Sequence, residues 1–90
     1  MPIFMVITSK DPKNVESAIN KLIPSEDQLK IDNRSWLVSS PKQIVTPKEL
    51  YDLLNGSSGE KLDNTIITLV TAYWGWHNIE VWDWLSAKKG

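Results

Sequence analysis

Histidine and cysteine, two residue types that often carry out catalysis, are almost absent from this 90-residue sequence. His77 is the only histidine, Arg34 is the only arginine, and there is no cysteine. A single imidazole acts as a general acid or base only beside a nucleophile or a second group that the fold supplies. No Gly-x-Ser-x-Gly motif or second histidine accompanies it, and Gly56 and Gly59 follow an expected helix instead of opening one around a phosphate. We therefore interpret His77 as a turn residue that is available for binding.

Tryptophan is the most unusual feature of the sequence, because four of the five lie close together near its end: Trp74, Trp76, Trp82 and Trp84. Indole rings can stack on nucleic-acid bases or on a planar ligand. They serve equally well as anchors in cores and interfaces, and we favour this structural or dimer-forming role. If the preceding strand continues, Trp74 and Trp76 share one of its faces. Trp82 and Trp84 point in roughly opposite directions on a helix, so we expect Trp82 to be buried and Trp84 to face a partner.

Asp11 is the one carboxylate placed where a metal ion could be held, since it follows an apolar strand and precedes a helix. Its oxygens suit Mg²⁺. An aspartate at this place also caps the helix that follows and is stabilised by the positive helix end, and we favour that role. No second carboxylate obviously joins it, so we expect no metal and no cofactor, with Asp11 as the only weak candidate. Arg34 lies in an expected hairpin turn, as a surface residue that could contact a partner.

These residues must be positioned by a single domain spanning residues 1–90, because the chain is too short for two cores. Residues 3–8 are continuously apolar, which indicates a strand buried on both faces. Residues 13–23 carry apolar side chains at spacings of three and four, which predicts a helix. Residues 29–39 alternate around Asn33-Arg34, which predicts a hairpin.

The second half of the chain gives two more helices and a strand. Thr46 and Glu49 form a capping box around Pro47, so a helix is expected from there to Leu54, with Asn55 to Gly59 ending it. Residues 65–72 predict the last strand, which Trp74 and Trp76 would extend across the sheet. Residues 79–85 predict a short closing helix with Val81, Trp82 and Leu85 on its buried side.

The order strand, helix, strand, strand, helix, strand predicts an α+β fold of the ferredoxin-like βαββαβ type. Its four-stranded antiparallel sheet has the first and third strands at the centre and both helices on one face, followed here by the short Trp-rich C-terminal helix. The other face has no helix of its own, although the first strand is apolar on both sides. We expect the Trp-rich tail, a second copy of the chain, or both to cover it.

Composition restricts the classes of function. A hydrophobic share of 41% and a charged share of 23% are typical of a globular protein. The net charge of −1 makes nucleic acid a less favoured partner than protein, because broad binding to phosphates needs an excess of positive charge. With no cysteine, no leader sequence and no membrane-spanning stretch, we expect a cytoplasmic protein with no membrane partner.

The strand at Ser35 to Val38, the helix at Thr46 to Leu54, the Gly75-Trp76 step and the Val-Trp-Asp-Trp-Leu ending resemble the SinR-like small bacterial proteins. These are similar in fold to the CRISPR-associated spacer-acquisition subunit and to toxin-type ferredoxin-like proteins. The resemblance implies a homodimer and a defence or toxin–antitoxin setting. In the nuclease-type relatives an aspartate at the end of the first strand would hold a metal ion across the dimer axis. Here the matching position is Ser9 or Lys10, and Asp11 comes one residue late.

The function expected from the sequence is therefore that of a small, non-enzymatic homodimer that acts through protein or nucleic-acid contacts. Its candidate binding residues are Arg34, Trp74, Trp76, His77 and Trp84. One alternative is a metal-dependent nuclease built on the same ferredoxin-like dimer. Another is an inhibitor that binds one macromolecular target.

Overall fold

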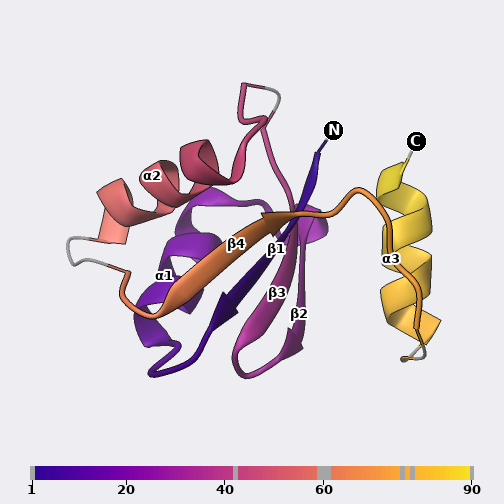
Figure 1. Ribbon diagram of the computed structural model, residues 1–90, viewed down its shortest axis with the longest axis horizontal. Coiled ribbons are helices and arrows are strands. Elements are labelled where there is room, and N and C mark those ends of the chain that lie inside the picture. Colours follow the sequence, from indigo (N-terminus) through magenta and orange to yellow (C-terminus); the bar gives the residue numbers. More distant parts are fainter. Residues whose placement is uncertain (1, 42, 59–61, 76, 78, 90) are drawn as a thin grey trace.

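A four-stranded antiparallel sheet organises the protein, with the first and third strands of the chain at its centre and the second and fourth at its edges (Figure 1). The computed structural model describes residues 2–41, 43–58, 62–75, 77 and 79–89. The strands are β1 at Ile3–Thr8, β2 at Gln28–Asp32, β3 at Ser35–Ser39 and β4 at Thr65–Leu69. The helices are α1 at Lys13–Leu22, α2 at Pro47–Ser58 and α3 at Ile79–Lys89, with a 3-10 turn η1 at Ser25–Asp27. The predicted α+β class and the central places of β1 and β3 are confirmed.

Helices α1 and α2 lie together on one face of the sheet, and α3 lies on the opposite side (Figure 1). Side chains alternate between the two faces of a strand, so β1 sends Phe4 and Val6 toward α1 and α2. The larger core forms there from these two side chains with others of β3, α1 and α2, among them Trp36, Val38, Ile19, Leu50 and Leu54. Trp36, the tryptophan outside the C-terminal group, is almost completely buried in this core.

The second face of the sheet carries a smaller core beneath α3. Ile3 of β1 and Leu37 of β3 pack there against Val81 and Leu85, which lie one helical turn apart. Half-buried side chains surround this cluster, namely Met5, Leu29, Ile31, Val70, Trp82 and Trp84. The C-terminal tail thus covers part of the sheet face that was predicted to have no helix of its own. None of the helices in the described part of the chain is long and apolar enough to cross a membrane.

Local chemistry sets the start of α2 as predicted. The Glu49 N–H donates to Thr46 Oγ1 at 3.2 Å, and the Thr46 N–H donates back to Glu49 Oε1 at 3.0 Å. The same carboxylate accepts the Val45 N–H at 3.1 Å. The hydrogen bonds that this carboxylate accepts, first from the Val45 N–H and then from the Thr46 hydroxyl, lower the pKa of Glu49 below its ordinary value. The capping box is therefore present in full.

The predicted end of α2 is wrong, because the helix continues through Asn55 and Gly56 to Ser58. A glycine inside a helix costs only about 1 kcal/mol, and contacts on both sides offset that cost. Leu54 is buried in the larger core, and Asn55 Oδ1 accepts the N–H of Leu62 at 2.9 Å. Leu62 is thereby tied to the last turns of α2.

The chain after β4 also departs from the expectation. The strand ends at Leu69 rather than residue 72, although the Val70 N–H still donates to the Ile3 carbonyl at 2.8 Å. Trp74 does not extend the strand across the sheet, and Trp76 lies outside the described residues. The closing helix α3 is longer than expected and reaches Lys89.

Candidate binding site: an aromatic pocket between the sheet and α3

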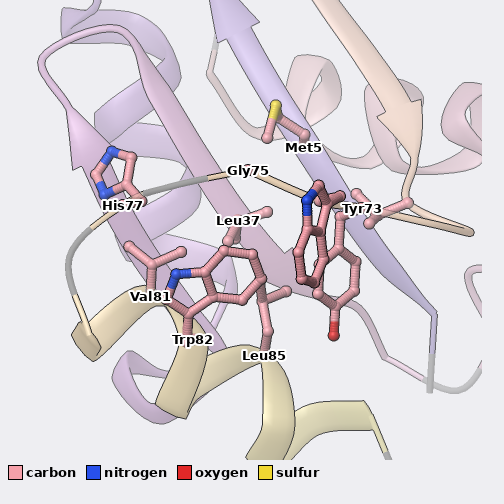
Figure 2. Close-up of a pocket in the computed structure, with 10 residues that line it drawn as sticks. Met5, Leu37, Tyr73, Gly75, His77, Val81, Trp82 and Leu85 are labelled. Atoms are coloured by element: carbon pink, nitrogen blue, oxygen red, sulfur yellow. The ribbon is translucent and has the colours of Figure 1, made fainter.

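An apolar pocket of about 200 Å³ lies between the second face of the sheet, α3, and the described residues that connect β4 to α3. Met5 and Leu37 contribute from the sheet, and Val81 and Leu85 from α3 (Figure 2). Val70, which follows β4, also lines the pocket. The remaining lining residues are Tyr73, Trp74, Gly75, His77 and Trp82. The pocket is therefore almost wholly apolar, with aromatic rings on one side and a single imidazole.

Three aromatic side chains form one contact group at this pocket. The ring of Trp82 lies 5.9 Å from that of Tyr73 and 6.4 Å from that of Trp74, measured between centroids. Both pairs are tilted, at 38° and 57°, and both separations fall within the range that aromatic pairs prefer. Trp74 nevertheless keeps 96% of its surface exposed. An indole this exposed gains almost nothing from folding, so its surface is available to a partner.

The position of α3 decides where these rings meet. Val81 and Leu85 insert into the smaller core, which directs Trp82 toward the segment that follows β4. At the far end of the helix, Lys88 Nζ bonds Asp27 Oδ1 of η1 at 2.8 Å. Both side chains are mostly buried, so the ion pair fixes the last turn of α3 to the body of the protein.

His77 lies at the opposite end of the pocket from Tyr73 (Figure 2). Its electrostatic effect reaches Asp32, at the end of β2. The pKa of Asp32 is lowered mainly by the hydrogen bond from the Arg34 N–H at 2.8 Å and then by that from the Ser35 hydroxyl, also at 2.8 Å. The charge of His77 contributes a smaller lowering. The hydrogen bonds within the β2–β3 turn, and not His77, therefore dominate this lowering.

The structure brings together only some of the predicted binding residues. Trp74 and His77 both line the aromatic pocket, whereas Trp76 lies outside the described residues. Arg34 is exposed in the hairpin turn, where its guanidinium donates to the Ser9 carbonyl at 3.1 Å. Trp84 does not line the pocket.

The expected contrast between the last two tryptophans is wrong. Trp82 and Trp84 are both half-buried, and both pack against the smaller core. The Nε1 atom of Trp84 is buried and has no hydrogen-bond partner among the described residues. Helix α3 lies along the sheet so that residues on both flanks of its Val81–Leu85 stripe touch protein. The helical spacing alone does not reveal such flanking contacts.

The structure places Pro12, not Asp11, at the cap position of α1, and Asp11 bonds the first helical residue instead. Its Oδ1 accepts the Lys13 N–H at 3.0 Å. It also lines a separate polar depression with Lys10, Asn14 and Asp63 among its neighbours. Sequence reasoning missed Asp63, which the fold brings to Asp11 from the turn before β4. No group of three or more potential metal ligands occurs within the described ranges of the chain.

The pocket itself was also missed, since Tyr73, Met5 and Leu37 had not been chosen as binding residues. One signal was present in the sequence. Met5 and Leu37 belong to the faces of β1 and β3 that the two predicted helices do not cover, so they had to meet the tail or a partner.

Comparison of the chain with protein-family models, curated proteins and solved structures found no match.

Proposed function

We propose that this protein is a small, non-enzymatic, homodimeric binding protein with a ferredoxin-like fold. Its binding surface is the aromatic pocket between the sheet and α3, and its ligand is a protein. The resemblance to SinR-like proteins suggests a defence or toxin–antitoxin setting, in which an inhibitor of one macromolecular target is one form of the same activity.

The observation that carries this proposal is the position of Trp74. Its ring lies beside an apolar pocket and remains 96% exposed. Tryptophan is enriched among the few residues that supply most of the binding energy at interfaces. It supplies that energy when the partner removes its ring from water. A pocket of about 200 Å³ accommodates one large side chain rather than an extended ligand.

The charge around the pocket favours a protein over a nucleic acid. No lysine or arginine belongs to the described residues that line it. Single-stranded nucleic acids are held by basic grooves that follow the phosphates, with aromatic stacking as an addition. Aromatic rings without neighbouring cations suit an apolar side chain of a protein partner better than they suit a nucleic acid.

The structure offers less support for the nuclease alternative. The carboxylate of Asp11 is engaged by the backbone at the start of α1. Asp63 lines the same depression, but Lys10 lines it as well and brings a positive charge that opposes cation binding. We therefore rank the binding function first.

Selection of peptides from a random display library against the purified protein tests the proposal. We expect the recovered peptides to share one large apolar or aromatic side chain. Trp74→Ala should weaken their binding at least about tenfold, as truncation of an interface anchor usually does. Its fold should be unaffected, because an exposed side chain contributes little to stability.

Val45→Ala provides the matched control, because Val45 is also an exposed apolar residue but lies before α2, away from the pocket. It should bind the selected peptides as the wild type does. Peptides that bind Trp74→Ala and wild type equally would contradict the proposal. Tight binding of a single-stranded oligonucleotide that depends on Trp74 would instead favour nucleic-acid stacking.

A further inference from the structure

The two edges of the sheet differ in how well they are protected against pairing with another strand. Edge strand β2 carries Lys30 and Asp32, and its register with β3 is broken between these two residues. Charged side chains and bulges are devices by which proteins block edge-to-edge association. The opposite edge, β4, has the sequence Thr-Ile-Ile-Thr-Leu, without a charge, a proline or a register shift. Ile66 on this strand is 65% exposed.

The hydrogen bonds to β1 define which backbone groups of β4 face outward. The Ser9 N–H donates to the Asn64 carbonyl, and the Val70 N–H donates to the Ile3 carbonyl. In an antiparallel pair the hydrogen-bonded residues alternate, so the even-numbered residues from 64 to 70 bond β1. The N–H and C=O groups of Thr65, Ile67 and Leu69 therefore point away from the sheet, toward the free edge.

We infer that β4 pairs antiparallel with β4 of a second copy of this chain, about a two-fold axis at Ile67. This inference rests on the homodimer in the proposed function and specifies its interface. In this register Ile67 faces Ile67 of the other copy, and Thr65 faces Leu69. Every outward residue then meets an outward residue, and each such pair exchanges both of its N–H···O bonds. The two four-stranded sheets join into one continuous sheet.

The side chains fit the same register. Ile66 lies opposite Thr68 of the other copy on the second face of the sheet, with the two Ile66 side chains diagonal to each other. These are β-branched neighbours of the kind that stabilise strand pairs. No residue of β4 is charged, so self-pairing opposes no like charges. Ile7, which lies opposite Ile66 within one chain and is exposed, extends the apolar strip next to the joint.

A second copy is the occupant that this strand fits best, because an isologous interface requires a patch that is complementary to itself. The strand meets that requirement in its hydrogen-bonding groups and in its lack of charge. No residue of β4 is among the described residues that line the aromatic pocket, so this pairing does not use the pocket lining.

Light scattering and amide hydrogen exchange, measured across a range of protein concentrations, test the inference. Light scattering should show a dimer at high concentration. As the dimer forms, the N–H groups of Ile67 and Leu69 should become protected from exchange. Those of Ile66 and Thr68 bond β1 and should be protected at every concentration. This alternation along one strand would not arise from an interface made by side chains elsewhere.

Ile66→Lys and Ile79→Lys form a matched pair of variants, since both side chains are largely exposed, at 65% and 76%. Ile66→Lys places two ammonium groups diagonal to each other across the joint and should raise the dimer dissociation constant at least about tenfold. Ile79→Lys, at the start of α3, should leave it unchanged. The β4 interface would be overturned by a dimer in which the Ile67 and Leu69 N–H groups gain no protection from exchange, or by one whose dissociation constant Ile66→Lys does not change. The homodimer itself would be unaffected by either result. A monomer at every concentration would overturn both, and the peptide selection would still test the pocket separately.

Discussion

Lys88 and Asp27 are separated by 61 positions in the sequence, yet their side chains form an ion pair of 2.8 Å between α3 and η1. About three quarters of each side chain is shielded from solvent, so water screens this pair less than a surface pair. A double-mutant cycle with Asp27→Asn and Lys88→Met should give a coupling energy of about 1 kcal/mol in urea unfolding. The exposed pair Lys48–Asp52 within α2 offers a control with a smaller coupling. Coupling energies that are equal for the two pairs would show that the Lys88–Asp27 pair does not hold α3.

Trp84 is expected to contribute to stability although the helical pattern placed it outside the buried stripe. Trp84→Ala should lower the free energy of unfolding by roughly 2 kcal/mol, because a half-buried ring leaves the smaller core. Trp84→Phe should change it by less than about 1 kcal/mol, since the lost area is offset by removal of the buried, unpaired indole N–H. Thermal unfolding of both variants, beside Trp82→Ala and Trp82→Phe, checks this. An unchanged free energy of unfolding in Trp84→Ala would mean that the ring does not pack as described.

The capping box predicts a specific dependence of stability on pH. Hydrogen bonds in the folded state lower the pKa of Glu49 below its ordinary 4.5. The charged carboxylate therefore stabilises the fold above that value, and its contribution is lost as the pH falls through the lowered pKa. Urea unfolding of wild type and Glu49→Gln between about pH 2 and pH 7 should show a difference that shrinks at the acid end. A difference that stays constant down to the lowest pH would contradict this assignment.

Thr46 tests the other half of the capping box at neutral pH. Thr46→Ala removes the acceptor of the Glu49 N–H and should cost about 1 kcal/mol, the usual effect of losing an N-terminal cap. Thr46→Ser keeps the hydroxyl and should leave the stability nearly unchanged. Equal losses in the two variants would indicate that the methyl group, not the hydrogen bond, matters at this position.

Asp11 is expected to stabilise the start of α1 through its bond to the Lys13 N–H and not to bind a metal ion. Asp11→Ala should lower the stability by about 1 kcal/mol through loss of the hydrogen bond from the Lys13 N–H. Binding of the selected peptides should not change. Asp63→Ala serves as the companion variant, since Asp63 lines the same depression. Nucleic-acid cleavage that requires a divalent metal ion and disappears in both variants would restore the nuclease alternative.

The sequence by itself determined the elements whose signals lie within a few residues of one another. The spacing of Val15, Ala18 and Ile19 placed α1, because side chains three and four apart share a helix face. Thr46 and Glu49 located the start of α2, since both partners of a capping box are local. The apolar character of β1 on both faces indicated a central strand, and its place in the sheet agrees.

Only the tertiary structure decided what happens after β4. The described residues that follow β4, from Val70 to Gly75, form no helix or strand, and Tyr73 and Trp74 meet Trp82 of α3. The docking of α3 rests on contacts between distant parts of the chain, such as those of Val81 and Leu85 with Ile3 and Leu37. The exposure of Trp74, the aromatic pocket and the approach of Asp63 to Asp11 all follow from such contacts. The spacing of residues along the chain does not predict these contacts. The same local pattern allows several arrangements, and packing between distant segments selects one of them.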